Sequence, residues 1–268
     1  MPTLHAMQFV LSPAKTLAFE SPVPAELLSK LTRPAFAAST TALITELKRK
    51  TPAQVAALMD LSDGLAALNV ARYRSWRKRA TPTNARPALL AFKGDVYAGL
   101  DAPSLSTDDV DWAQQHLLML SGLYGILRPL DLMQPYRLEM GTTLATEQGA
   151  DLYAFWGARL AQVLDTRAAA DATPIIVNLA SQEYFRAVPR KALRARVIDC
   201  VFEDWKSGGY KIISFFAKRA RGMLARQAIQ ERWTLPAQLA GFNRDGYAYV
   251  ADASTPARWV FRRRFDEA

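Results

Sequence analysis

Histidine and cysteine are scarce in this sequence of 268 residues, which contains two histidines and one cysteine. Neither His5 nor His116 stands at a metal-ligand spacing from Cys200 or from the other histidine, so the sequence argues against a zinc, haem or iron–sulfur site. A single cysteine also rules out an intramolecular disulfide framework, and Cys200 lies in an apolar run that favours a buried thiol. We therefore expect neither a metal site nor a cofactor.

Long apolar runs are missing as well. No 18 consecutive residues are apolar, and the N-terminus has no basic segment followed by an apolar stretch, so we expect no membrane span and no signal peptide. The protein is therefore predicted to be cytoplasmic, with no membrane partner. Because 50% of the residues are hydrophobic and no linker, low-complexity tract or repeat divides the chain, residues 1–268 are predicted to form one domain, and a monomer is favoured.

Glycine-rich phosphate-binding loops are also absent. Lys15 and Thr16 resemble the end of a P-loop without its glycines, which argues against nucleoside triphosphate hydrolysis. Ser12 and Lys15 fit the Ser-x-x-Lys pattern of acyl-transfer enzymes, but the companion Lys-Thr-Gly motif is missing. We instead expect Lys15 just beyond the first strand, where it either contacts a phosphate or forms a salt bridge that fixes the turn.

Positive charge is concentrated in the last third of the chain. Residues 1–185 contain 17 Lys and Arg and 17 Asp and Glu, whereas residues 186–268 contain 17 basic and 8 acidic residues. Within that part, residues 186–226 hold 11 basic and 3 acidic residues. Such a surplus attracts polyanions and is typical of nucleic-acid-binding proteins, although a basic surface that serves only solubility has the same composition.

Hydrophobic patterns and capping residues predict strands and helices in an irregular order. Thr51 and Gln54 form a capping-box pattern that opens a short helix, and Ser106 with Asp109 is a further candidate cap. Strands are expected at 5–11, 89–92, 174–179, 197–202 and 209–216, with a hairpin of 247–250 and 259–263. Further helices are expected at 62–78, with Leu65, Leu68, Ala71, Tyr73 and Trp76 on or near one face, and at 106–118, 149–166 and 217–232. The predicted class is a mixed α/β (α+β) fold, a mixed sheet surrounded by helices.

Three pairs of opposite charge lie beside glycine or proline, and charges in such apolar surroundings are paired or functional. The pairs are Lys93 with Asp95, Arg128 with Asp131, and Arg137 with Glu139. We expect them to line a common cleft, whereas the alternative is a buried ion-pair network that fixes the loops. Polar residues elsewhere are expected to line the same cleft: Ser12, Tyr136, Asn178, Ser181, Glu183 and Tyr184.

A further group of cations follows at residues 214–226. On a helix, Lys218 and Arg221 share one face, and Arg219 and Arg226 lie on an adjacent face together with Gly222. This spacing predicts a basic stripe in which Gly222 permits close approach to a backbone or a ligand. The predicted DNA contacts are Lys93, Arg128, Arg137, Lys218, Arg219, Arg221 and Arg226.

Five blocks of the sequence carry a family resemblance and span most of its length. They are Ser12-Pro-Ala-Lys-Thr16, Ala91-Phe-Lys-Gly-Asp-Val-Tyr97, the run at residues 121–141, Asn178-Leu-Ala-Ser-Gln-Glu-Tyr-Phe185 and Ser214-Phe-Phe-Ala-Lys-Arg-Ala-Arg-Gly222. Together they resemble the YaaA family of bacterial peroxide-stress proteins. The resemblance implies an unusual single-domain α/β fold, and a role in limiting hydrogen peroxide damage that is associated with lower intracellular free iron.

The resemblance also implies a helix-hairpin-helix DNA-binding element, for which two segments compete. Residues 120–127 contain glycines spaced Gly-x-x-Gly, one residue longer than the usual Gly-x-Gly of that hairpin. The helical pair at residues 52–78, hinged near 61–64, is the other candidate. Its tail at residues 72–79 adds five cations and two aromatics, a composition suited to phosphate contact and base stacking.

Two hypotheses follow. The first is a cytoplasmic peroxide-stress protein that binds double-stranded or distorted DNA through a basic cleft, largely independently of sequence, and limits iron-dependent damage. The second is an enzyme that acts on a nucleic acid or nucleotide-like substrate in the same cleft. Its catalytic candidates are Lys15 or Glu139, as nucleophile or proton-transfer group, and Asp131. A purely structural or regulatory protein would require a large exposed apolar patch, which we cannot locate in the sequence.

Overall fold

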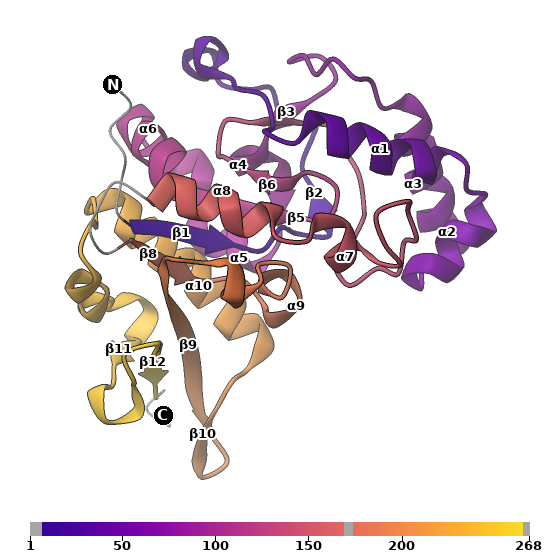
Figure 1. The fold of residues 1–268 in the computed structure, drawn as a ribbon. Coiled ribbons are helices and arrows are strands. Elements are labelled where there is room, and N and C mark those ends of the chain that lie inside the picture. Colours follow the sequence, from indigo (N-terminus) through magenta and orange to yellow (C-terminus); the bar gives the residue numbers. More distant parts are fainter. Residues whose placement is uncertain (1–6, 169–173, 265–268) are drawn as a thin grey trace.

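The computed structural model describes residues 7–168 and 174–264, which form a mixed eight-stranded sheet with helices around it (Figure 1). The strand order is β11-β12-β9-β8-β1-β5-β6, and β10 pairs with the outer half of β9. The strands of this sheet are β1 (Met7–Leu11), β5 (Leu117–Ser121), β6 (Gly125–Leu127), β8 (Ile175–Asn178), β9 (Arg196–Lys206), β10 (Gly209–Lys211), β11 (Ala248–Tyr249) and β12 (Arg258–Arg263). Two small sheets pair β2 (Thr16–Leu17) with β4 (Phe92–Lys93), and β3 (Arg86–Pro87) with β7 (Leu132–Met133). The predicted mixed α/β class is confirmed.

Helices surround the sheet. The α-helices are α1 (Ala37–Lys48), α2 (Pro52–Met59), α3 (Asp63–Ser75), α4 (Ala88–Ala91), α5 (Asp95–Leu100), α6 (Thr107–His116), α7 (Leu152–Trp156), α8 (Arg159–Ala168), α9 (Gln182–Phe185) and α10 (Ser214–Gln230). Short 3-10 helices are η1 (Ala25–Lys30), η2 (Ala102–Ser104), η3 (Arg190–Ala192), η4 (Pro236–Gly241), η5 (Arg244–Gly246) and η6 (Ala251–Ala253). None of the helices in the described ranges is both long and apolar enough to cross a bilayer.

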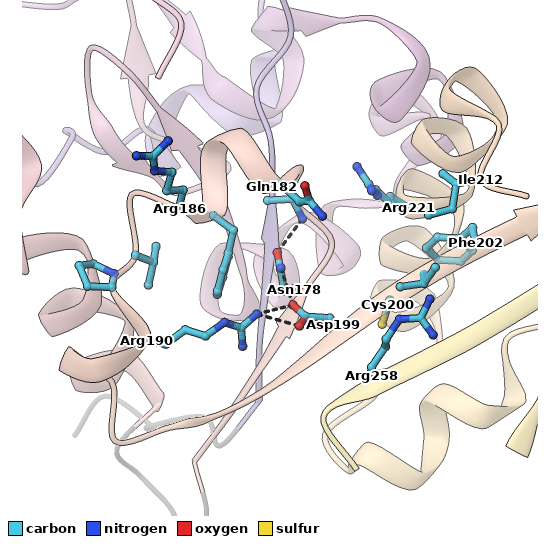
Figure 2. A pocket seen from close by; sticks show the side chains of 15 residues that line it. Asn178, Gln182, Arg186, Arg190, Asp199, Cys200, Phe202, Ile212, Arg221 and Arg258 are labelled. Atoms are coloured by element: carbon cyan, nitrogen blue, oxygen red, sulfur yellow. Dashed lines mark hydrogen bonds and ion pairs between the residues drawn. The ribbon is translucent and has the colours of Figure 1, made fainter. Parts of the chain in front are cut away.

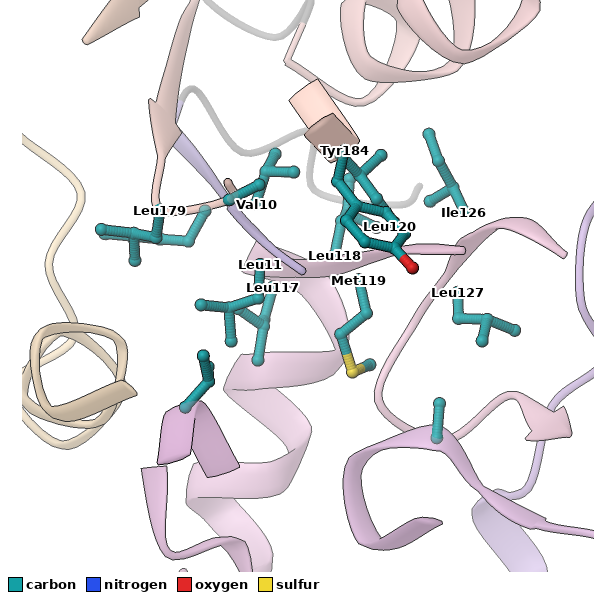
Figure 3. Packing of buried hydrophobic residues seen from close by; sticks show 14 of the residues in the cluster. Val10, Leu11, Leu117, Leu118, Met119, Leu120, Ile126, Leu127, Leu179 and Tyr184 are labelled. Carbon is teal, nitrogen blue, oxygen red and sulfur yellow. The ribbon is translucent and has the colours of Figure 1, made fainter. Parts of the chain in front are cut away.

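The centre of the sheet is parallel and apolar. Strands β5, β1, β8, β9 and β12 run in the same direction, whereas β6, β10 and β11 pair antiparallel to their neighbours. Every residue of β1, β5 and β8 is buried, as expected for parallel strands covered on both faces. Figure 3 shows side chains of these strands and of the adjacent hairpin packed together: Val10, Leu11, Leu117, Leu118, Met119, Leu120, Ile126 and Leu127.

Helix α8 covers one face of the sheet, and α5 and α10 lie on the other (Figure 1). The last two helices cross at glycines. A Cβ atom on Gly222 would overlap the carbonyl oxygen of Val96 in α5, and one on Gly99 would overlap the carbonyl oxygen of Arg219 in α10. Gly222 therefore permits close approach to a backbone, as predicted, but it is buried in the helix crossing and is not part of an exposed stripe.

Several predicted elements are confirmed. Thr51 and Gln54 form a reciprocal capping box at the start of α2, and Ser106 with Asp109 forms one at the start of α6. The strand predicted at residues 174–179 is β8, and the predicted C-terminal hairpin pairs β11 with β12. The first predicted strand is β1, although its first two predicted residues, 5 and 6, lie outside the described residues.

Other predicted elements are wrong. Residues 89–91 belong to the helical turn α4, and the strand predicted at 209–216 ends at Lys211 because α10 begins at Ser214. The helix predicted at 149–166 is two helices separated at Gly157, whose φ of 52° interrupts the helical backbone. Of the residues predicted on or near one face of the helix at 62–78, Leu65, Leu68 and Ala71 are exposed, whereas Tyr73 and Trp76 are buried as predicted. Ala66 and Val70 complete the buried face of α3.

The two segments considered for a helix-hairpin-helix element fold differently. Residues 120–127 form the end of β5, a tight turn and β6, so this segment contains no helical pair. Helices α2 and α3 follow one another closely and pack together, with Asp60 at φ 49° ending α2. Of the two segments, only residues 52–78 contain consecutive helices.

Candidate functional site

The direction in which the sheet is wound changes between β1 and β8. The chain passes from β1 to β5 on one side and later returns to β8 on the other side of β1, so the direction of winding reverses between β1 and β8. In open α/β sheets, ligands bind at the carboxyl ends of the strands where this reversal occurs. At that edge, the Ser181 amide donates to Ser12 Oγ at 2.8 Å, and the two hydroxyls lie 3.3 Å apart. These contacts join the loops that follow β1 and β8.

Lys15, Glu139 and Arg137 meet beside this edge. The Lys15 ammonium contacts Glu139 Oε2 at 2.7 Å, and Arg137 Nη2 donates to Glu139 Oε1 at 2.9 Å. The Lys15 side chain is 62% exposed, whereas those of Arg137 and Glu139 are 17% and 20% exposed. The structure thus places one carboxylate between two cations, and the Lys15 ammonium faces solvent.

Buried tyrosines lie beneath these loops. Tyr97 donates to the Ser12 carbonyl oxygen at 2.9 Å, and the Tyr136 hydroxyl lies 2.6 Å from Ser121 Oγ. Burial, with the neighbouring phenols as a smaller contribution, raises the pKa of Tyr97 and Tyr184, and burial raises that of Tyr136. These phenols therefore remain neutral hydroxyl groups at physiological pH. We refer to Ser12, Lys15, Tyr97, Tyr136, Arg137, Glu139, Ser181 and Tyr184 as the switch-point cluster.

Three of the predicted cleft residues lie next to the cluster. Lys93 is paired with Thr16 between β4 and β2, and a Cβ on Gly94 would lie 3.5 Å from the Ala14 side chain. Lys93 and the following Asp95 are both exposed beside the loop after β1. Glu183 Oε1 accepts the Gly141 amide at 3.0 Å, which orders the segment that carries Glu139. Asn178 lies at the end of β8 and lines a neighbouring pocket instead.

Arg128 and Asp131 lie elsewhere, beside α1 and α8. The Asp131 carboxylate is 1% exposed and accepts hydrogen bonds from Arg128 Nη2 at 2.9 Å, the Arg128 amide at 2.8 Å and Thr32 Oγ1 at 2.6 Å. This arrangement matches the alternative of an ion-pair network that fixes a loop. The three charge pairs therefore do not share one cleft, and the catalytic roles of Lys15, Glu139 and Asp131 stay predictions.

The cations of α10 have three different environments. Lys218 and Arg219 are exposed and form no ion pair with any residue in the described ranges. Arg226 donates to the carbonyl oxygens of Leu100 and Asp101 at 2.9 and 2.8 Å, so it ties α10 to the end of α5. Arg221 is largely buried and lines a pocket. The predicted stripe is therefore not uniformly exposed.

That pocket, of about 540 Å³, lies between the carboxyl-terminal half of β8, β9 and α10 (Figure 2). It is lined by four arginines, Arg186, Arg190, Arg221 and Arg258, and we call it the arginine pocket. Asp199 is the only carboxylate among its described lining residues. Arg190 binds both oxygens of Asp199 at 2.8 and 2.7 Å, and Asn178 Nδ2 donates to one of them at 2.8 Å.

Sequence reasoning missed most of the arginine pocket. Asn178, Asp199 and Arg258 are register partners across the three parallel strands β8, β9 and β12, although they lie far apart in the chain. Of these three, only Asn178 was selected from the sequence, because it lies at the end of a predicted strand. Arg221, which lines the same pocket, was predicted as a DNA contact. Cys200 also lines the pocket; it is in a strand and buried as predicted, and burial raises the pKa of its thiol, so the thiol stays protonated.

Comparisons with known proteins agree with this fold-wide resemblance. The family model described as peroxide stress protein YaaA matches residues 7–253. A UPF0246 protein of Paracidovorax citrulli is 60% identical over 258 residues, 96% of this chain and 99% of its own length. A UPF0246 protein of Variovorax paradoxus is 58% identical over 262 residues (97% and 100%), and one of Albidiferax ferrireducens is 58% identical over 261 residues (96% and 98%). The chain therefore belongs to the family of the peroxide stress protein YaaA.

Proposed function

We propose that this protein binds DNA through the basic surface around α10 and thereby helps to limit iron-dependent oxidative damage during peroxide stress. The observation that carries the proposal is the environment of the 11 basic residues at 186–226. Of these, only Arg190 and Arg226 form ion pairs with residues in the described ranges. The remaining nine charges are not neutralised by those residues, and all of them except that of the largely buried Arg221 are exposed and available to a polyanion.

The three acidic residues of the same segment do not offset these charges. Asp199 binds Arg190, Glu203 binds Arg258 and Arg262, and Asp204 binds Arg263. Their carboxylates are therefore occupied by arginines, three of which lie in the C-terminal strand β12. The surplus at residues 186–226 thus remains a property of the folded surface and supports contacts to a phosphate backbone.

We assign the helix-hairpin-helix role to α2 and α3 within this proposal. Four exposed cations lie at the end of α3 and just beyond it, namely Arg74, Arg77, Lys78 and Arg79, whereas Tyr73 and Trp76 are buried and not available for base stacking. Such a sequence supports additional phosphate contacts by side chains. The role of α2 and α3 can be separated from that of α10 by mutating each region alone.

Titration of labelled duplex and four-way-junction DNA at about 50 and 200 mM salt tests the proposal. Affinity should fall by orders of magnitude between the two conditions and depend little on sequence, because phosphate contacts release counterions. Absence of binding even at the lower salt concentration would remove DNA as the partner.

The double variant Lys218→Ala, Arg219→Ala should weaken DNA binding by about tenfold or more and reduce the slope of log affinity against log salt by about 2. Both side chains are exposed, so the fold should be unaffected. The charge-conserving pair Lys218→Arg, Arg219→Lys is the matched control and should bind like the natural protein. Equal affinity of all three proteins would show that the Lys218 and Arg219 side chains do not contact DNA. Arg74→Ala with Arg79→Ala tests α3 in the same assay.

The cellular part of the proposal is tested by survival of hydrogen peroxide in a strain that lacks the gene. The natural sequence should restore survival, and the Lys218→Ala, Arg219→Ala variant should restore less. An iron chelator should reduce the difference between them if the damage depends on iron. Full protection by a variant that no longer binds DNA would show that protection against peroxide does not depend on DNA binding.

The switch-point cluster supports a second candidate function, an enzyme acting on a nucleic acid or nucleotide-like substrate. The observation that favours it is the position of Lys15 and Glu139 at the reversal of strand order, above neutral tyrosine hydroxyls. A deprotonated Lys15 amine could add to the aldehyde of abasic DNA and form an imine with loss of water, and Glu139 could accept the proton. Borohydride would reduce that imine to a stable amine. Failure to trap a complex, with full stress protection by Lys15→Ala, would reject this route.

A further inference from the structure

Arg221 is a largely buried cation that has no counterion among the described residues. Its Nε atom is buried and has no hydrogen-bond partner among the described residues, and no carboxylate of those residues forms an ion pair with it. Desolvation by burial lowers the pKa of this guanidinium. Burial of an unpaired charge is costly, so such a group is expected to meet an anion that is supplied from outside the chain.

Two acidic residues of the adjacent strand β9, Asp199 and Glu203, cannot supply that anion. Both oxygens of Asp199 already accept hydrogen bonds from Arg190, and one accepts a further bond from Asn178. Glu203 contacts Arg258 at 3.4 Å and Arg262 at 2.9 Å. Figure 2 shows Arg221 extending from α10 on the side of the pocket opposite Arg190 and Asp199. Arg221 is thus separated from the carboxylate that neutralises Arg190.

The lining of the arginine pocket indicates the kind of anion. Four arginines against one aspartate give the lining a formal charge of +3, which suits a dianion better than a carboxylate. Guanidinium groups bind phosphate oxygens in pairs, and this favours a phosphate over a spherical anion. Phe185, Phe202 and Ile212 line the same space, so an apolar or aromatic group is accommodated beside the phosphate.

We propose that the arginine pocket binds the phosphate monoester of a nucleotide, with Arg221 as its principal contact. The pocket's volume of about 540 Å³ lies within the range of small-ligand sites. The phosphate monoester comes either from a free mononucleotide or from the 5′ end of a DNA strand. The proposal is independent of duplex binding through Lys218 and Arg219, because it concerns a pocket and not the exposed surface.

Isothermal titration calorimetry of the whole protein in low-salt, phosphate-free buffer tests the site. The probes are adenosine 5′-monophosphate, adenosine and inorganic phosphate, together with single-stranded DNA that carries either a 5′-phosphate or a 5′-hydroxyl. We expect the monophosphate to bind and to raise the thermal unfolding temperature, and adenosine to do neither. A preference for 5′-phosphorylated over 5′-hydroxyl DNA would identify the DNA end as the source, and binding of the mononucleotide alone would identify the free nucleotide.

Arg221→Gln should reduce the affinity for the monophosphate at least tenfold and abolish its effect on the unfolding temperature, because a charge-assisted contact is lost. Arg244→Gln is the matched control: it removes an exposed arginine charge outside the pocket lining and should change affinity by less than about twofold. Arg221→Lys keeps the charge but loses the planar fork, so it should bind with intermediate affinity.

Three results would overturn the proposal. They are absence of binding by every phosphorylated probe, equal affinity of the natural protein and both Arg221 variants, and an equal loss in Arg244→Gln. If Arg221→Gln does not fold, the comparison of Arg221→Lys with Arg244→Gln decides. Loss of phosphate binding in the Arg221 variants with unchanged duplex binding would support the pocket and leave the DNA proposal intact, so failures of the two proposals are distinguishable.

Discussion

Individual arginine residues of this fold differ in whether a carboxylate of the protein pairs with them. Arg263 and Asp204 are 2% and 1% exposed at the side chain and lie 2.6 Å apart, and Tyr247 donates to the second oxygen of Asp204 at 2.8 Å. Arg263 is also stacked against the rings of Phe216 and Tyr247. This pair is fully enclosed and stabilises the join between β9 and β12. Arg221, by contrast, is largely buried and forms no ion pair with a carboxylate of the described residues.

Asp204→Ala should lower the free energy of unfolding by about 3–5 kcal/mol, because it leaves the Arg263 charge buried without its main partner. Chemical denaturation followed by circular dichroism measures the change. Asp252→Ala removes an exposed carboxylate in η6 and serves as the control, with an expected change within about 0.5 kcal/mol. Equal effects of the two substitutions would show that the buried pair does not contribute specifically.

The sequence alone identified some residues of the candidate sites and missed others. Lys15 and Glu139 were both selected as functional candidates, and the structure brings them into contact although they are distant in the chain. Asp199 and Arg258 were not selected, because neither lies in a motif and their proximity depends on the register of β9 and β12. Arg128 and Asp131 resembled the other charge pairs in sequence, and only tertiary packing distinguishes their buried loop from the switch-point cluster.

At the level of secondary structure elements, the sequence provided a signal for the close crossing of α5 and α10. Gly222 was singled out because glycine lowers helix propensity without an evident local benefit. The benefit is tertiary, since Gly99 and Gly222 allow the two backbones to touch. This contact also fixes the turn of α10 that carries Arg221 and Lys218.

Gly222→Ala should destabilise the protein by about 1–3 kcal/mol or more, because the added methyl group would overlap the Val96 carbonyl oxygen and force the helices apart. Gly64→Ala is the control in α3, where nothing lies within 4 Å of the new methyl group, and it should stabilise by up to about 1 kcal/mol. Urea unfolding midpoints of both variants measure the difference. Similar midpoints would indicate that the helix crossing adjusts without cost.

Local signals predicted some element boundaries and missed others. The capping boxes at Thr51 and Ser106 depend on contacts three residues apart, so the sequence alone was sufficient to locate the starts of α2 and α6. The apolar residues 89–91 fit a buried strand or a buried helical turn equally well, and the contacts of α4 with neighbouring segments decide between them. Leu65 and Leu68 misled the prediction for α3, because its apolar residues do not follow a single face.

At the scale of the whole molecule, the mixed class was predictable from interspersed strands and helices, but the strand order was not. Regular β-α-β spacing would have indicated a known arrangement, and this chain lacks it. The reversal between β1 and β8 depends on pairing over more than 160 residues. The positions of the switch-point cluster and of the arginine pocket therefore follow from strand pairing between residues that are far apart in the chain.

Buried tyrosines should limit the stability of the whole molecule at alkaline pH. Burial raises the pKa of Tyr124 to about 12 and also raises the pKa of Tyr73, Tyr97, Tyr136 and Tyr184. Below pH 10 their stabilising contribution is fully present, and it is lost as pH rises above 10, where the unfolded chain releases protons that the folded protein retains. Stability should fall by up to about 7 kcal/mol per pH unit when all five are counted.

Absorbance at 295 nm and far-ultraviolet circular dichroism, recorded together between pH 9 and 13, measure this effect. The five buried phenols should ionise only as the helical signal is lost, and both changes should occur within about one pH unit. Ionisation of all tyrosines before any loss of structure would contradict the expectation. Replacement of Tyr124 by Phe should make the free energy of unfolding fall less steeply with pH above 10.

The position of β12 affects how the protein is made. This strand lies between β9 and β11, although it follows both along the chain. A ribosome releases β9 and β11 first, so one long edge of β9 stays open in the nascent chain until residues 258–263 have emerged, and open edges invite aggregation. Arg258 enters its pocket in the same step. Closure of the sheet and completion of the arginine pocket therefore depend on the same strand.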